Sequence, residues 1–311
     1  MLSFEPLELR HIPLVAPYFS YQCARICDCT VGSVFMWREY FRTAFAIEDD
    51  TLFFRVTYTD GNIAYPFPLG PDPARGLTRL RQHCQESGEP FQMCTVPRAG
   101  LELCQKLFPD CEATAQRDWF DYLYTREDLA FFKGRRYSGQ RNHINRFLKQ
   151  FPEWSYTIIG PDTLSQAREY LISFAAERSK DDQLAQEEMD KVLEVMDHFD
   201  AYGMVGGLLK VGDTIVGLSL GEIVGDTLFV HIEKALREYP GAYQMLVSQF
   251  ARTFGDESTQ YVNREEDVGD EGLRTSKLSY HPIELLEKYT VAIPLRTSAE
   301  HPSAAAEPAL V

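Results

Sequence analysis

The chain has 311 residues and carries 31 Lys and Arg against 46 Asp and Glu, a formal net charge of −15 at pH 7. Apolar residues make up 44% of it and aromatic residues 13%, values that exclude a wholly disordered, collagen-like or coiled-coil chain. No apolar stretch approaches the roughly 20 residues that span a bilayer, and the first ten residues include Glu5, Glu8 and Arg10 rather than an apolar signal run. We therefore expect a cytoplasmic protein with no membrane insertion.

Short strands separated by turn residues predict a compact α/β unit in the first half of the chain. The Asp-Asp pair at 49–50 and the Asp-Gly pair at 60–61 are typical of hairpin turns. The expected strands are Phe4–Arg10, Thr43–Glu48, Thr51–Tyr58 and Asn62–Phe67, and the expected helices are Leu77–Ser87 and Leu101–Phe108.

The second half has a more regular pattern. A strand at Ser155–Ile159 precedes two segments with apolar residues at helical spacing, and two Gly-Asp turns then separate three strands. The expected helices are Pro161–Arg178, Gln186–Phe199, Pro240–Phe254 and Glu271–Ser276, and the expected strands are Met204–Lys210, Thr214–Ile223, Thr227–Ile232, Gln260–Asn263 and Tyr289–Ile293.

The element order of the second half resembles the GNAT (acyl-CoA N-acyltransferase) fold, and the first half repeats that order more loosely. We therefore expect an α/β (α+β) chain of two tandem GNAT-like domains, each a mixed, mostly antiparallel sheet flanked by helices. The expected boundaries are an N-terminal domain over 1–130, a basic connecting segment over 131–152, a C-terminal domain over 153–295 and a disordered tail over 296–311.

The seven cysteines do not predict a disulfide framework, because their number is odd and no signal peptide is visible. Cys23, Cys27 and Cys29 form a C-x3-C-x-C cluster, which is not a common zinc or iron–sulfur spacing. We expect buried or incidental thiols and no metal, with a metal site or a redox sensor as the alternatives.

A basic segment spans residues 133–149, with six Lys or Arg and no acidic residue. In an acidic chain such a segment favours a phosphate-bearing ligand, either CoA, a nucleotide or an RNA backbone. The alternative is a connecting helix whose arginines pair with carboxylates of the same protein. Ile144 and Leu148 are expected to face the core. The candidate residues for binding the donor or another anion are Arg136, Arg141, Asn142 and Asn145.

A second polar cluster follows the expected strand that ends at Asn263. Ligands commonly bind at the carboxyl ends of strands in open α/β sheets. We expect Asn263 and Glu265 to be catalytic, and amide variants at Glu265 or Asp267 to leave stability unchanged or slightly raised. A structural salt-bridge network is the alternative. The candidate residues for binding the acceptor are Arg264, Asp267, Lys277 and Tyr280.

A third candidate site surrounds the end of the strand at 227–232. Glu233 could act there as a general base toward an amine, or could pair with Lys234 or Arg264. Gly241, Ala242 and Tyr243 begin the next helix, whose free N–H groups suit the pyrophosphate or carboxylate of a donor. His231 is expected to be a lone histidine that faces away from Ile232.

Together these segments resemble the phosphatidylglycerol lysyltransferase C-terminal-like family, in particular its soluble bacterial members, from about Phe4 to Ile293. The matching segments are Gly134–Tyr137, Arg141–Phe147, Glu233–Lys234, Gly241–Tyr243 and Val262–Pro282, with Phe35–Trp37 and Arg117–Tyr122 earlier in the chain.

The resemblance implies a tandem GNAT fold related to Fem-type aminoacyltransferases, which move an aminoacyl group from a charged tRNA to an amine or hydroxyl. The chain lacks the Gly-rich Q/R-x-x-G-x-G/A loop of CoA-dependent relatives, so acetyl-CoA is expected to bind weakly. We expect no permanent cofactor, and an acyl- or aminoacyltransferase with CoA or aminoacyl-tRNA as the donor substrate. The alternative is a non-catalytic binding or regulatory module of the same fold that recognises an anionic metabolite or partner.

Overall fold

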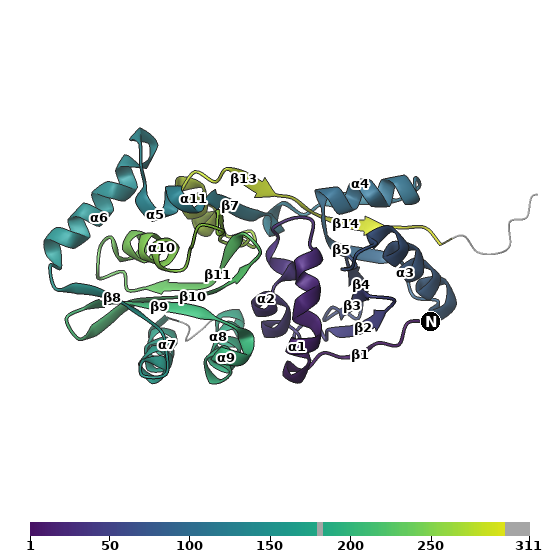
Figure 1. Ribbon diagram of the computed structural model, residues 1–311, viewed down its shortest axis with the longest axis horizontal. Coiled ribbons are helices and arrows are strands. Elements are labelled where there is room, and N and C mark those ends of the chain that lie inside the picture. Colours follow the sequence, from purple (N-terminus) through teal and green to yellow (C-terminus); the bar gives the residue numbers. More distant parts are fainter. Residues whose placement is uncertain (179–182, 296–311) are drawn as a thin grey trace, which may run out of the picture.

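The computed structural model describes residues 1–178 and 183–295, and the expected tail over 296–311 lies outside the described residues. Two mixed seven-stranded sheets lie side by side, each flanked by helices (Figure 1). This arrangement confirms the α/β class. Within the described residues, no helix is both long enough and apolar enough to cross a membrane.

The first sheet is built mainly from the first half of the chain. Buried apolar side chains of two helices, α3 (Pro73–Ser87) and α4 (Arg98–Leu107), pack on one of its faces. In spatial order its strands are β1 (Glu5–Pro6), β2 (Ala44–Glu48), β3 (Thr51–Thr57), β4 (Ile63–Pro66), β5 (Gln92–Pro97), β14 (Lys288–Ala292) and β6 (Glu112–Ala115).

The second sheet has helices on both faces (Figure 1). Its strands in spatial order are β13 (Glu284–Leu286), β7 (Asp121–Thr125), β12 (Tyr261–Asn263), β11 (Thr227–Ala235), β10 (Thr214–Val224), β9 (Val205–Val211) and β8 (Trp154–Ile158). One face carries α5 (Arg126–Phe131), α6 (Ser138–Gln150), α10 (Ala242–Thr253) and α11 (Glu271–Ser279), and the other carries α7 (Leu164–Arg178), α8 (Gln183–Asp197) and α9 (Phe199–Tyr202).

The two halves exchange one strand each. In the first sheet β4 and β5 are parallel, and β14, from the end of the chain, lies antiparallel beside β5. In the second sheet β11 and β12 are parallel, and β7, from the first half, lies antiparallel beside β12. Each sheet is therefore completed by a strand from the other half, and strand pairing crosses the expected domain boundaries.

The N-terminal segment joins the two halves. The expected strand over 4–10 shrinks to β1, because Pro6 cannot donate to a sheet and the chain then coils into short helical turns. Two of these helices, α1 (Ile12–Val15) and α2 (Val31–Met36), lie between the sheets (Figure 1). Their apolar side chains share one hydrophobic cluster with α7 and α8, so the halves have a common core.

The basic helix α6 packs differently from the expectation. Phe147 is fully buried, Ile144 is half-buried, and Leu148 is 36% exposed, so the expectation that Leu148 faces the core is wrong. The rotation of the helix follows from Phe147, which packs with Leu246 and Met245 of α10 in one cluster. Leu148, one position further on, is turned by about 100° away from that contact.

Candidate functional site

The candidate site lies where the parallel strands β11 and β12 separate. Their pairing ends at Phe229 and Asn263. After these residues β11 continues to Ala235, while the segment that follows β12 turns away. The turn is at Glu265, whose φ of +55° is unusual for a residue other than glycine. The predicted residues 263–265 therefore stand at the carboxyl end of β12, at a break in the sheet.

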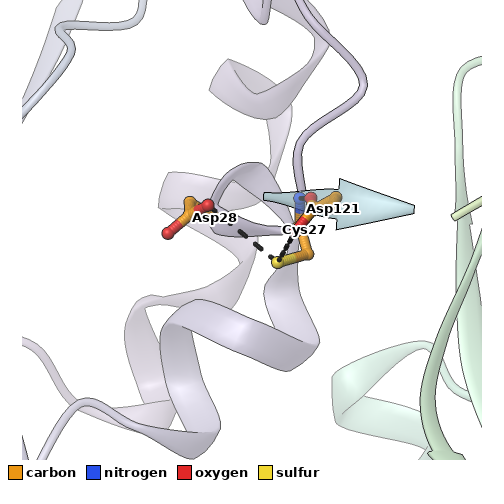
Figure 2. A group of neighbouring side chains, drawn as sticks. All are labelled: Cys27, Asp28 and Asp121. Carbon is orange, nitrogen blue, oxygen red and sulfur yellow. Dashed lines mark hydrogen bonds between the residues drawn. The ribbon is translucent and has the colours of Figure 1, made fainter. Parts of the chain in front are cut away.

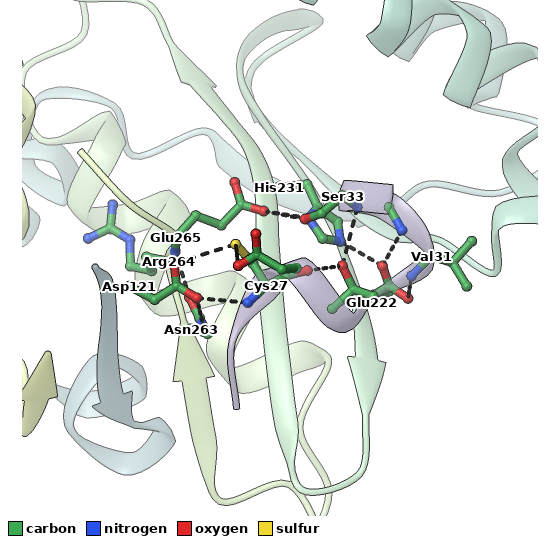
Figure 3. Close-up of polar contacts among 12 residues, drawn as sticks. Cys27, Val31, Ser33, Asp121, Glu222, His231, Asn263, Arg264 and Glu265 are labelled. Atoms are coloured by element: carbon green, nitrogen blue, oxygen red, sulfur yellow. Dashed lines mark hydrogen bonds and ion pairs between the residues drawn. The ribbon is translucent and has the colours of Figure 1, made fainter. Parts of the chain in front are cut away.

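On one side of this break, a histidine is held between two carboxylates. His231 Nδ1 lies 2.7 Å from Glu265 Oε1, and Nε2 lies 2.8 Å from Glu222 Oε1 (Figure 3). Burial alone would lower the pKa of the imidazole, but its hydrogen bonds to the two carboxylates raise that pKa to about 10. The side chain is therefore an imidazolium at neutral pH.

A β-bulge directs His231 toward these carboxylates. Leu220 pairs with Ile232 and Gly221 pairs with Val230, so His231 is the extra residue on β11. The ring lies against α2 at Gly32, where any Cβ would be 2.4 Å from Nε2. The expectations that His231 is alone and faces away from Ile232 are both wrong, since Ile232 packs in the cluster that contains α2 and the bulge breaks the alternation.

The same carboxylates fix the start of α2. The backbone N–H groups of Val31 and Gly32 donate to Glu222, at 3.1 and 2.5 Å, and Ser33 Oγ donates to Glu265 Oε1 at 3.3 Å. A carboxylate at a helix N-terminus is favourable because free N–H groups and the helix dipole meet it there. A helix from the first half thus closes one side of a site in the second half.

A second ion cluster adjoins the first, around Lys288. Its Nζ lies 2.5 Å from Asp28, 2.8 Å from Asp121 and 3.6 Å from Glu266, and it donates to Cys27 Sγ at 3.3 Å. The donor atoms of Cys27, Asp28 and Asp121 are close enough together to hold a metal ion (Figure 2). Lys288 already supplies a positive charge to these same three groups. Burial and the neighbouring carboxylates raise the pKa of the Cys27 thiol well above its usual value.

Asn263 connects this cluster to the turn. Its Nδ2 donates to the carbonyl of Arg25 at 2.6 Å and to Asp121 Oδ2 at 2.9 Å, while its Oδ1 accepts from the N–H of Glu265 at 2.7 Å. The side chain is completely buried. These contacts shape the turn that presents Glu265.

Arg264 points to the other side of the break, toward α10 and α11. Its Nη2 donates to Glu233, and its guanidinium carbon lies 4.6 Å from the centre of the Tyr280 ring. Burial opposes the charge, but Glu233 keeps the pKa of the guanidinium above its ordinary value. Nη1 is buried and has no hydrogen-bond partner among the described residues. Glu233 thus forms the ion pair with Arg264 that the sequence offered as its alternative role.

Two further predicted residues hold the loop after Arg264. Lys277 Nζ donates to the carbonyls of Arg264 and Glu265, at 2.6 and 3.1 Å, and burial lowers the pKa of this ammonium. Asp267 is completely buried and accepts from Arg274 Nη2 at 2.7 Å and from Arg117 at 3.1 Å. Both residues serve the conformation of the loop in this structure.

The residues predicted to bind a donor lie on α6 and α10 and in the short segments that precede these helices. Gly241 precedes α10 with a φ of +94°, and a Cβ there would lie 2.3 Å from the carbonyl oxygen of His143. The backbone that packs closely against Gly241 is therefore that of α6. The sequence had predicted a pyrophosphate of the donor at this position. The next residue, Ala242, is buried, and Tyr243 is half-buried.

The predicted donor-binding residues of the 133–149 segment, together with Arg146 and Lys149, form two groups. Arg136 pairs with Asp128 at 2.7 Å, and Arg141 donates to the backbone carbonyls of Phe132 and Gly134. The pair of Arg136 with Asp128 matches the structural alternative, whereas Arg141 binds backbone carbonyls and no carboxylate among the described residues. Exposed side chains of α6 form the other group: Asn142, Asn145, Arg146 and Lys149.

Sequence reasoning missed several residues of the centre: Asp28, Ser33, Asp121, Glu222, Glu266 and Lys288. Asp121 could have been predicted, because it lies in the 117–122 segment that carried the family resemblance. Glu222 and Lys288 had no such signal, since each is a single charged residue in an otherwise ordinary strand pattern.

Residues 24–292 match the family described as phosphatidylglycerol lysyltransferase, C-terminal. A solved structure of a conserved protein of unknown function from Bacteroides thetaiotaomicron is 32% identical, with a TM-score of 0.88 over 94% of this chain and 100% of that one. L-PGS from Bacillus licheniformis is 11% identical, with a TM-score of 0.65 over 96% of this chain and 95% of that one. FemX is 10% identical, with a TM-score of 0.59 over 94% and 98%. These likenesses confirm the expected tandem GNAT-like fold.

One curated relative also matches. It is an uncharacterized protein of Mycoplasmoides gallisepticum, 23% identical over 174 residues, which are 56% of this chain and 56% of that protein. The match therefore spans about half the length of the curated relative.

Proposed function

The chain belongs to the phosphatidylglycerol lysyltransferase C-terminal family, and from that premise we propose that it is an acyl- or aminoacyltransferase. It moves an (amino)acyl group from an activated donor to an amine or hydroxyl acceptor at the break between β11 and β12. The proposed donor is an aminoacyl-tRNA. An acyl-CoA is the second choice, because His143 occupies the space beside Gly241 where its pyrophosphate was expected to bind.

The observation that carries the proposal is the state of Glu265. Its side chain is 24% exposed, while the histidine that orients it is 2% exposed and positively charged. Two more carboxylates nearby, Asp28 and Glu266, are exposed by 25% and 29%. Three partly exposed carboxylates therefore lie beside the buried cations His231 and Lys288, and this acidic surface suits an amine or ammonium group of a substrate.

Each group then has a role in the proposed reaction. Glu265 orients the reacting amine toward the ester or thioester carbonyl of the donor and accepts the proton that the amine loses as it attacks. The new C–N bond replaces the C–O or C–S bond of the donor, and the leaving hydroxyl or thiol takes that proton. When the amine attacks, negative charge develops on the carbonyl oxygen, and a preorganised donor must stabilise it. In this proposal substrate binding uncovers Arg264 Nη1, which is buried and has no partner among the described residues, and Nη1 then donates to that oxygen while Glu233 holds Nη2. Asn263, Lys277, Asp267 and Tyr280 are positioning residues.

The test is transfer of a labelled acyl group by the purified full chain. Aminoacyl-tRNAs with radiolabelled amino acids, and labelled acetyl-CoA in parallel, are incubated with the chain and an extract of bacterial lipids and small amines. We expect label to move from an aminoacyl-tRNA to an acceptor, and Glu265→Gln to lose at least about tenfold in rate, equal to roughly 1.4 kcal/mol of transition-state stabilisation.

The matched control is Glu257→Gln, an exposed glutamate remote from the break, which should transfer at the parental rate. A Glu265→Gln variant as fast as the parent would contradict the proposed role of Glu265. Absence of transfer from every donor, with a ligand still bound at the break, would favour the non-catalytic binding module.

A further inference from the structure

One outer strand of the second sheet lacks the features that keep sheet edges from pairing. Proteins protect an outer strand with charged side chains, proline, a bulge or a very short length. In the first sheet, the outer strand β1 is two residues long and contains Pro6, and the outer strand β6 contains Glu112. In the second sheet, β13 is three residues long and contains Glu284. The opposite outer strand, β8, has none of these features.

The strand β8 is regular and uncharged. Its five residues, Trp-Ser-Tyr-Thr-Ile, include no acidic or basic residue and no proline. They pair with β9 in a continuous antiparallel register without a bulge, and β9 is the one strand that β8 pairs with in the described sheets. The side chain of Ile158 is 56% exposed. An apolar, unprotected edge of this kind is a template for another strand.

The hydrogen bonds beside β8 establish which of its backbone groups point outward. The N–H of Ile159 donates to the carbonyl of Gly206 on β9 at 2.8 Å. Bonded residues alternate along an antiparallel pair, so the even-numbered residues of β8 turn their N–H and C=O groups away from β9. The N–H of Trp154 is already engaged, because it donates to the carbonyl of Phe151 at 3.2 Å.

We propose that two copies of this chain pair through β8, antiparallel to each other, about a twofold axis at Tyr156. The outward groups of β8 are arranged symmetrically about Tyr156, so the axis places donors opposite acceptors. Tyr156 of each copy exchanges two backbone hydrogen bonds with Tyr156 of the other. The N–H of Ile158 in each copy donates to the carbonyl of Trp154 in the other. The two second sheets thereby become one continuous sheet.

The side chains of β8 favour a second copy over an unrelated strand. Opposite residues of an antiparallel pair project on the same face of the sheet. The exposed Ile158 of one copy therefore meets Trp154 of the other, and Ser155 meets Thr157. An aromatic side chain opposite a β-branched one, and two hydroxyls opposite each other, are both favourable cross-strand pairs. Within the strand no like charges meet, so β8 is complementary to itself.

The pairing leaves the candidate site accessible. The strands β9 and β10 lie between β8 and β11, so the break between β11 and β12 is remote from the twofold axis. The proposed dimer therefore does not depend on the proposed transfer reaction. One five-residue edge buries less than the roughly 1,200 Å² typical of stable interfaces. We expect a weak dimer, with a dissociation constant on the order of 100 µM.

The first test is sedimentation of the full chain at about 5 to 500 µM. We expect monomer at the lowest concentration and dimer at the highest. Ile158→Lys adds a charge to the edge and should weaken association at least about tenfold. Ile223→Lys is the matched control and should associate like the parent, because Ile223 is 44% exposed and lies on the interior strand β10. A parent that stays monomeric, or an Ile158→Lys variant that associates like the parent, would overturn the proposal.

A pair of cysteine variants tests the register. Ser155 and Thr157 of opposite copies form a non-hydrogen-bonded pair, whose Cα atoms lie about 4.5 Å apart, within the span of a disulfide. Under mild oxidation, a mixture of Ser155→Cys and Thr157→Cys should crosslink at least about fivefold more than either variant alone. The parent gives the background from its own thiols, such as the exposed Cys23. Equal crosslinking in the mixture and in the single variants would overturn the twofold register. Melting curves confirm that each variant is folded.

Discussion

Lys288 Nζ lies 2.8 Å from Asp121 Oδ1, and these two residues are the first residues of the two exchanged strands, β14 and β7. Each strand leaves its own half at this point and enters the other sheet. Both side chains are almost completely buried. The crossing of the two halves is therefore held by an ion pair that also belongs to the candidate site.

The first prediction is that Lys288→Met strongly destabilises the protein. The ammonium neutralises Asp121 and Asp28, and burial of these carboxylates without it is costly. Breaking a buried pair by removing one partner costs roughly 3–5 kcal/mol. Chemical denaturation of the parent and the variant at pH 7 measures the loss.

A double variant separates the ion pair from simple packing. Lys288→Met combined with Asp121→Asn should recover part of the lost stability, because one of the unpaired charges is then absent. Lys106→Met, at an exposed lysine of α4, is the control and should stay within about 0.5 kcal/mol of the parent. A Lys288→Met protein as stable as this control would contradict the role of the pair.

The second prediction distinguishes Asp267 from Glu265. Burial acts to raise the pKa of Asp267, but hydrogen bonds from Arg274 and Tyr122 hold it well below its ordinary value. Asp267→Asn should therefore cost roughly 3–5 kcal/mol, unlike the unchanged stability expected from the sequence. Glu265→Gln, at a partly exposed side chain, should cost about 1 kcal/mol or less. Thermal melting of the two variants beside the parent makes the comparison.

The same pKa fixes the direction of a pH effect. Because the folded-state pKa of Asp267 is lowered, its stabilisation is present above the unfolded value of about 4 and is lost as the pH falls through the folded value. The stability difference between the parent and Asp267→Asn should shrink below about pH 4. A difference that stays constant down to pH 3 would contradict the ion pairs described for Asp267.

The third prediction concerns the charge of His231. Its folded-state pKa of about 10 exceeds the unfolded value of about 6.5. The stabilisation from the charged ring is therefore complete below about pH 6.5 and is lost as the pH rises through about 10, by up to roughly 1.4 kcal/mol per pH unit. His231→Gln should show a flatter stability curve over this range. Nitrogen-15 NMR should find both ring nitrogens of His231 protonated at pH 8, and a neutral ring there would contradict the bridge.

Much of the second half could be predicted from the sequence, because its signals are local. The strands β9, β10 and β11 have Gly-Asp turns between them, and the apolar faces of α7 and α8 follow helical spacing. The polar cluster after Asn263 was also found, since a run of charged residues directly follows a core strand. Each of these features is visible within about fifteen residues.

The features that were missed depend on distant partners. Each of the strands β7 and β14 pairs in the sheet of the other half, and no local sequence pattern indicates which sheet a strand joins. The strand β6 is exposed at every position, so it has no alternation of apolar and polar residues to detect. His231 meets Glu222 and Glu265 only because a bulge turns it. Such long-range pairing is fixed by tertiary packing, which overrides local preference.

The last prediction divides the basic residues of α6 by their function. Arg141 donates to the carbonyls of Phe132 and Gly134, in the segment that follows α5, and so it stabilises the connection between α5 and α6. Arg141→Ala should lower stability by about 1–2 kcal/mol, the loss of hydrogen bonds from a charged group that is partly exposed. Arg146 is exposed and has no ion-pair partner among the residues described, so Arg146→Ala should stay within about 0.5 kcal/mol of the parent.

Binding of a polyphosphate probe should depend on Arg146 and not on Arg141, the reverse of the expected effects on stability. If the exposed face of α6 meets a phosphate-bearing ligand, Arg146→Ala should weaken binding of a single-stranded RNA probe and reduce the slope of log Kd against log salt by about 1. Arg141→Ala should keep that slope, because its guanidinium is already engaged with backbone carbonyls. Titrations at several salt concentrations give both slopes. If Arg141→Ala keeps its stability but loses RNA binding, Arg141 is part of the donor site. If the slope for Arg146→Ala is unchanged, the exposed face of α6 is not part of that site.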